Sequence, residues 1–108
     1  MEDFVLCQGD TIKVNYVIPE DLTFKTVYFT FGNGINGFVK KIKCTPQSVT
    51  SQNYKRMAEG GICIPFTGTD LENPGSFFAQ FFILDKNEHQ TTYPPIGYLS
   101  IKIQQSVF

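Results

Sequence analysis

The chain has 108 residues, of which 42% are hydrophobic and 18% are charged, and its formal net charge is −1. This length and balance predict a single globular domain over residues 1–108 and exclude a disordered chain. The near-neutral charge provides no global attraction to nucleic acid or to an anionic membrane, so we expect neither as a partner. The opening MEDFVLCQGD has no basic start before an apolar run, and no apolar run approaches about 20 residues. The sequence therefore predicts neither a signal peptide nor a membrane span.

The cysteines Cys7, Cys44 and Cys63 are odd in number and form no CxxC pair. This pattern opposes both a disulfide framework and a cysteine-based zinc site. We expect three reduced, partly buried thiols from a reducing compartment. The sequence permits a bridge between Cys44 and Cys63 but does not require one.

The first part of the chain reads as short strands separated by turns. Phe4–Cys7 is a brief apolar stretch, and Gln8–Asp10 turns the chain. Thr11–Val17 alternates apolar and polar residues, which predicts a half-buried strand. Ile18–Asp21 contains a proline and ends that pattern, because proline donates no ladder hydrogen bond. Lys25–Phe31 then alternates again and predicts the next strand.

The segment Gly32–Gly37 matches the pattern G-x-G-x-x-G of dinucleotide-binding loops. That loop functions at the start of a helix, whereas this segment leads into the strand-like run Phe38–Cys44. Its two Asn-Gly pairs instead predict a hairpin turn. The three lysines of the following strand are interpreted as the solvated face of an edge strand. They are Lys40, Lys41 and Lys43.

Ser51–Glu59 is the one predicted helix, short and ended by two glycines. Ile62–Phe66 alternates as a strand, and Pro65 within it predicts an edge or bulged position. A loop rich in turn residues, Thr67–Gly75, then leads to the strand that we expect at the centre of the fold.

That central strand is Phe77–Leu84, in which both alternating sets of side chains are largely apolar. Such a pattern predicts burial on both faces. Asp85–Glu88 is predicted to close a hairpin, and Tyr93-Pro94-Pro95 is predicted to carry the chain across to a last strand, Tyr98–Ile103. The Tyr93–Pro94 bond is a candidate for the cis form, and the trans form is the expected one. In total the sequence predicts an all-β fold, an antiparallel β-sandwich of about seven strands with at most the one short helix.

The search for catalytic or metal-binding groups finds no set with suitable spacing. His89, the only histidine, follows a turn and is interpreted as a surface residue. The acidic groups near Asp70 and Asp85 could bind calcium, but turn chemistry explains both, and neither has the spacing of a dedicated loop. We expect no enzyme activity, no catalytic residue, no cofactor and no metal.

Four aromatic residues fall on the strand faces opposite the inward sets. They are predicted to line a partner-contact surface, and a second core layer between the sheet and its loops explains them equally well. These residues are Tyr28, Phe78, Phe82 and Tyr98.

The order of motifs resembles a known family. Gln8–Thr11 enters a strand, GICIPF starts at Gly61, Asn73–Phe81 begins the next strand, and Thr92–Tyr98 precedes the last one. In this order the chain is similar, from Gln8 to Ile103, to the amino-terminal immunoglobulin-like domain of baseplate upper proteins of tailed phages of Gram-positive bacteria, and to related small prophage tail proteins. The chain differs from that pattern in ending at Phe108, where the family continues into a helical stem.

The resemblance implies an immunoglobulin-like sandwich that is a non-enzymatic part of a phage or prophage tail or baseplate. It implies anchoring by packing against other tail or baseplate subunits, a possible homo-oligomer in the particle, synthesis in the bacterial host cytoplasm and location in the virion. The alternative is a carbohydrate-binding β-sandwich, which the absence of tryptophan opposes. A third possibility, a small barrel for single-stranded nucleic acid, is opposed by the charge balance.

Overall fold

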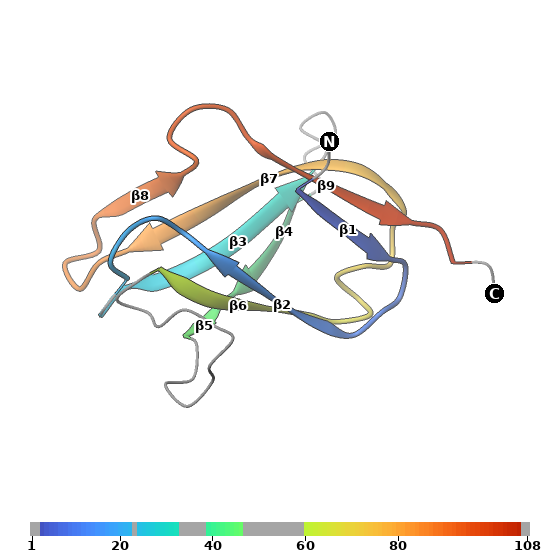
Figure 1. Ribbon diagram of the computed structural model, residues 1–108, viewed down its shortest axis with the longest axis horizontal. Helices are drawn as coiled ribbons and strands as arrows, with labels where there is room; N and C mark the ends of the chain where they lie inside the picture. The colour runs from blue at the N-terminus through green and yellow to red at the C-terminus, as the bar shows by residue number, and fades with distance from the viewer. Residues whose placement is uncertain (1–2, 23, 33–38, 47–59, 107–108) are drawn as a thin grey trace.

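The computed structural model of the protein describes residues 3–22, 24–32, 39–46 and 60–106. These residues form nine strands and no helix, so the predicted all-β fold is confirmed (Figure 1). The predicted helix at 51–59 and the glycine turn at 33–37 lie outside the described residues. The strands are β1 Phe4–Cys7, β2 Ile12–Val17, β3 Thr26–Gly32, β4 Val39–Lys43, β5 Thr45–Pro46, β6 Gly61–Phe66, β7 Gly75–Leu84, β8 Gln90–Tyr93 and β9 Leu99–Gln104.

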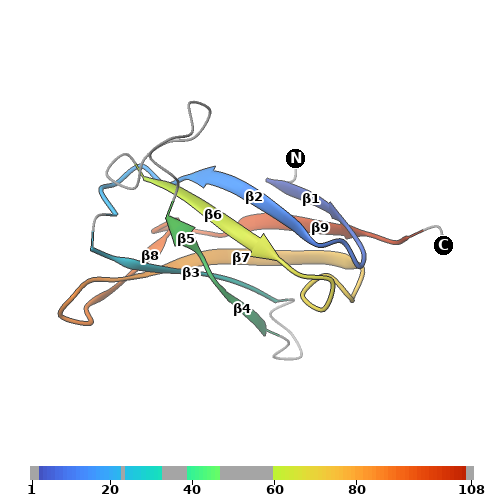
Figure 2. The ribbon, with the colours of Figure 1, turned by 90° about the horizontal axis from the view of Figure 1, so that it is seen from below.

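The strands form two sheets that lie one above the other (Figure 2). The larger sheet has six strands in the order β1-β9-β7-β3-β4, with β8 also paired to β7, and the smaller has the order β2-β6-β5. Every pair is antiparallel except β1–β9, where Phe4 lies opposite Ile101 in parallel register. This parallel pair differs from the predicted antiparallel arrangement, which all the other pairs have. No tight turn joins the two ends of the chain, so nothing local imposes antiparallel pairing on them.

Strand β7 is the centre of the larger sheet, as the sequence predicted. One edge pairs with β3, and the other pairs first with β9 and then with β8. The Pro94-Pro95 segment therefore separates two strands on the same edge of β7 and does not carry the chain to the other sheet. The Tyr93–Pro94 peptide bond is cis, contrary to the expected trans form.

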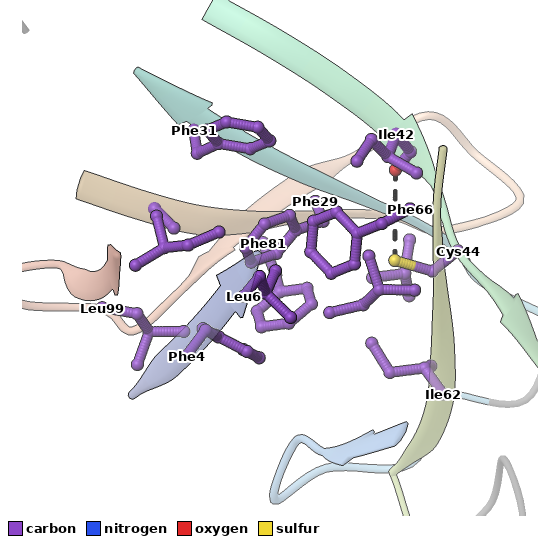
Figure 3. Packing of buried hydrophobic residues seen from close by; sticks show 14 of the residues in the cluster. Phe4, Leu6, Phe29, Phe31, Ile42, Cys44, Ile62, Phe66, Phe81 and Leu99 are labelled. Atoms are coloured by element: carbon purple, nitrogen blue, oxygen red, sulfur yellow. Dashed lines mark hydrogen bonds between the residues drawn. The ribbon is translucent and has the colours of Figure 1, made fainter. Parts of the chain in front are cut away.

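The core lies between the two sheets and is centred on Phe29, which is fully buried (Figure 3). Its ring centre is 5.1 Å from that of Phe81 on the neighbouring strand and 5.6 Å from that of Phe66 on the opposite sheet. Phe4 approaches it from β1 at 5.3 Å. Alternation along the strands brings these rings to one face, because successive side chains point to opposite sides. The inner layer on β7 consists of Phe77, Ala79, Phe81 and Ile83.

The outer face of β7 is not covered as the sequence predicted. Phe78 is 57% exposed, whereas Phe77 and Ala79 on either side of it are buried. The expectation of a strand buried on both faces is therefore wrong. Its apolar outward positions lie on an open sheet face.

Strand β6, for which Pro65 predicted an edge or bulged position, lies inside its sheet but at Pro65 is paired on one side only among the described strands. It is the middle strand of the small sheet, between β2 and β5. Pro65 is tolerated there because β5 pairs only with Ile62 and Cys63, so at Pro65 the pairing is with Lys13 of β2 alone among the described strands.

Candidate functional site

The outward face of the six-stranded sheet carries the four aromatic residues that the sequence singled out. Tyr28 lies directly opposite Phe82 on the β3–β7 pair. Phe78 lies further along the same face of β7, and its ring centre is 5.7 Å from that of Tyr98, which precedes β9. The structure therefore places the four residues as two pairs along one face. We call these four residues the outer aromatic face.

The pair nearer β9 is the more exposed because its neighbours are small. Phe78 lies between Gly32 of β3 and Ser100 of β9, and neither side chain can cover its ring. Phe78 is 57% exposed and Tyr98 is 65% exposed. Large apolar rings that remain this accessible mark a surface suited to contact.

The pair nearer β4 is half-buried. Phe82 lies between Tyr28 and Thr92, both larger than the neighbours of Phe78. The Lys41 ammonium lies 4.3 Å from the centre of the Tyr28 ring, a cation–π contact that occupies one side of that ring.

The strand backbone between the two pairs is held by a side-chain contact. Thr30 is buried, and its hydroxyl donates a hydrogen bond of 3.1 Å to the Gln80 carbonyl oxygen across the β3–β7 pair. This bond adds to the ladder hydrogen bonds. The two aromatic pairs therefore stand on either side of a cross-strand contact that adds to the ladder between β3 and β7.

Positive charge flanks the outer aromatic face on both sides. Lys43 lies opposite Tyr28 on β4, and Lys102 lies opposite Ser76 on β9. Since paired residues share a face, both lysines and Lys41 point outward with the rings. The outward positions of the described strands in this sheet hold these three lysines and no Asp or Glu.

Asp3 is the acid that reaches the border of this face, and its carboxylate is already engaged. It accepts a hydrogen bond of 2.8 Å from the Ser100 backbone N–H, and the Ser100 hydroxyl lies 3.4 Å from the same oxygen. These contacts bind the segment before β1 to the start of β9.

Lys40, although adjacent in sequence, does not join the outer face. It lies opposite Phe31, whose side chain points into the core, and its ammonium is 3.6 Å from the Glu72 carboxylate. The sequence grouped Lys40 with Lys41 and Lys43 and did not single out Lys102. Alternation along β9 places Tyr98, Ser100 and Lys102 on the same solvent-facing side of the strand. This pattern could have identified Lys102.

The acidic turns that could have bound calcium use their carboxylates locally. The Asp70 carboxylate accepts hydrogen bonds from the Thr67 backbone N–H at 2.9 Å and from its hydroxyl at 2.8 Å. The Asp85 carboxylate accepts hydrogen bonds from the backbone N–H of His89 at 2.9 Å and of Asn87 at 2.8 Å. These bonds hold the pKa of Asp85 below its usual value, and the bond from His89 contributes most. Among the described residues, no group of three or more His, Cys, Asp and Glu is arranged to hold a metal ion.

A surface pocket of about 210 Å³ lies next to the β7–β8 turn, and two of its charged side chains already have partners. Asp85 caps that turn, and the imidazole of the exposed His89 lies 3.6 Å from its carboxylate. The Lys25 ammonium is 3.2 Å from Glu20. Asp85 therefore serves the turn, and Lys25 serves an ion pair. Its lining residues are Phe24, Lys25, Asp85, Lys86 and Asn87.

The thiols show no disulfide: Cys7 is exposed, while Cys44 and Cys63 are buried, and all three are free. Burial raises the pKa of Cys44 to about 12, so this thiol stays protonated and unreactive near neutral pH. The expectation of partial burial is wrong for Cys7, and the reduced state stays a prediction.

No family model matches the chain, and no curated protein matches it. In the part of the chain that the structure describes, no helix has the length and hydropathy needed to cross a membrane.

Proposed function

We propose that this chain is a non-enzymatic structural module that packs against other protein subunits through the outer aromatic face. The observation that carries the proposal is the exposure of Phe78 and Tyr98, whose rings lie side by side on the outer face of the large sheet. Aromatic residues are enriched at the centres of protein interfaces, where each buries a large area at a small cost in conformational entropy.

We further propose that the sandwich is immunoglobulin-like. In that arrangement strands B, E and D share one sheet, and strands C, F and G share the other, which additional strands can extend. The order β2-β6-β5 matches B-E-D, and β9-β7-β3-β4 matches G-F-C followed by an added strand. The strand order supports the assignment.

The proposed setting is the tail or baseplate of a phage or prophage, with synthesis in the bacterial host cytoplasm and assembly into the virion. Its support is the similarity in motif order to the amino-terminal domain of baseplate upper proteins. The partners would be other tail or baseplate subunits.

Purified phage particles from a culture that produces the chain test this proposal. Mass spectrometry should find the wild-type chain in the particles, and Phe78→Ser combined with Tyr98→Ser should leave it in the unassembled fraction. Phe24→Ser is the matched control, because Phe24 is 87% exposed but lies away from this face. Absence of the wild-type chain from particles would contradict the setting, and incorporation of the double variant would contradict the role of the face. A glycan array with the purified chain tests the carbohydrate-binding alternative.

A further inference from the structure

We infer that the partner of the outer aromatic face is a protein surface with an apolar centre and acidic groups around it, and not a second copy of this chain. The inference rests on the proposed function and specifies the chemistry of the partner. It is carried by the distribution of charge on the sheet face.

The charge on this face differs from that of the whole chain. The chain has nine basic and ten acidic residues, yet the outward positions of the described strands in the large sheet carry three lysines and no acid. Lys41 and Lys43 stand on β4 at one side of the rings, and Lys102 stands on β9 at the other. A partner can cover Phe78 and Tyr98 with apolar side chains. Such a partner then lies next to lysine side chains on both sides of these rings.

A second copy is disfavoured by the same charges. If two copies associate through this face, the three lysines of one copy lie opposite the three lysines of the other. Like charges that face each other across an interface oppose association. The described strands provide no outward acid to pair with them, and Asp3 at the border of the face adds one negative charge per copy against three positive ones.

Single-stranded nucleic acid also fits this face less well than a protein does. Stacking of successive bases needs accessible ring faces in series. One side of the Tyr28 ring is covered by Lys41, and the rings of Phe78 and Tyr98 are tilted by 47° against each other. What remains is a compact apolar spot with separated positive charges, which suits an acidic protein segment.

The test uses a yeast-displayed library of random twelve-residue peptides. The library is sorted for binding to the wild-type chain and against binding to the Phe78→Ser/Tyr98→Ser variant, so that only face-dependent peptides are kept. We expect these peptides to combine apolar residues with Asp and Glu. Circular dichroism of the variant, in which only exposed rings are changed, should match that of the wild type.

The selected peptides are then measured in solution against two matched charge variants. Lys43→Glu/Lys102→Glu should weaken binding about tenfold or more, and added salt should weaken binding to the wild type. Lys13→Glu/Lys86→Glu changes the net charge by the same amount away from the face and should leave binding within about twofold.

The outcomes separate this inference from the proposed function. Face-dependent peptides that lack acidic residues, or equal effects of the two charge variants, would overturn the acidic partner and leave the contact face standing. No face-dependent peptides would overturn both. Oligo-dT binding that is lost in the aromatic variant, or a dimer in light scattering that the aromatic variant abolishes, would also overturn the inference.

Discussion

Gly60 is a residue at which the structure leaves no room for a side chain. Its φ is +89°, and a β-carbon added there would lie 1.5 Å from the Ile18 carbonyl oxygen. The Ile18 N–H donates a 2.8 Å hydrogen bond to the Gly60 carbonyl, which closes the end of the β2–β6 pair. Gly60→Ala must therefore separate the two segments. We expect a loss of about 4 kcal/mol or more in the free energy of unfolding, measured by urea denaturation.

Gly97→Ala is the control that isolates backbone strain from the clash. Gly97 has a φ of +78°, and no atom lies within 4 Å of an added β-carbon. Only the cost of the left-handed conformation applies there, about 1–2 kcal/mol. Equal losses for the two variants would show that the close approach to Ile18 does not exist.

The buried thiol of Cys44 and the half-buried phenol of Tyr16 predict that the fold weakens at alkaline pH. Desolvation by burial raises the pKa of Cys44 to about 12 from a usual value of 9.0. Desolvation also raises the pKa of Tyr16 to about 12 from 10.0, and the neighbouring Tyr93 adds to this shift. Both groups are neutral when protonated and ionise more easily in the unfolded chain. Their stabilisation is therefore complete below about pH 9 and is lost as the pH rises toward 12.

Urea denaturation at about pH 8 and pH 10.5 measures this loss. For Cys44 alone it amounts to at most about 2 kcal/mol over that interval. Cys44→Ala should make stability less dependent on pH from about pH 9 upward, and Tyr16→Phe should do so from about pH 10. If stability is unchanged between the two pH values, both side chains must be better solvated than the structure shows.

Among the elements, β7 provides the sharpest contrast between its two faces. Phe81 is fully buried and packs within 5.1 Å of both Phe29 and Tyr16, measured between ring centres. Phe81→Ala should therefore cost about 3–5 kcal/mol in the free energy of unfolding. Phe78→Ala removes the same atoms from the exposed face and should cost about 1 kcal/mol or less. Thermal unfolding of the two variants makes the comparison, and similar losses would mean that the outer face is covered.

Local periodicity explains which elements could be predicted. Strands such as β2 and β3 could be predicted because apolar and polar residues alternate in them, and that period of two follows from strand geometry alone. Strand β7 could be predicted from a nearly continuous apolar run between turn signals. Strand β5 was missed because Thr45–Pro46 is too short to show a period. Pairings such as β1–β9 could not be predicted, since they join residues from opposite ends of the chain. No tight turn connects the two strands, so no local sequence signal sets their register.

The candidate site was predictable in part for the same reason. Alternation placed Tyr28, Phe78 and Phe82 opposite the core, and the structure brings these residues to one face. Their exposure could not be predicted from the pattern. Apolar residues on the outward side of a strand are compatible with a second core layer and with a surface that contacts a partner. It depends on Gly32 and Ser100, the small neighbours of Phe78 on two other strands. Such neighbours become visible only once strand order and register are known.

At the scale of the whole molecule, Gln8 joins three segments at one end of the sandwich. Its backbone N–H donates to the Gln104 carbonyl at 2.8 Å, and its side-chain amide donates to the Glu72 carbonyl at 3.0 Å. Its side-chain oxygen accepts a hydrogen bond from the Ser106 N–H at 3.1 Å. The turn after β1, the loop before β7 and the segment after β9 are therefore held by one residue of the Gln8–Thr11 motif.

Gln8→Ala removes both side-chain hydrogen bonds while leaving the backbone bond to Gln104. The loss in the free energy of unfolding should be about 1–2 kcal/mol, because the groups left without Gln8 are near the surface and can bind water. Amide hydrogen exchange should become faster at Ser106 and remain slow at the centre of β7, since the sheets do not depend on this contact. Gln105→Ala, at an exposed neighbouring glutamine, should change neither quantity. Faster exchange throughout β7 would show instead that this end of the sandwich and the sheet centre open together, and that Gln8 supports the whole fold.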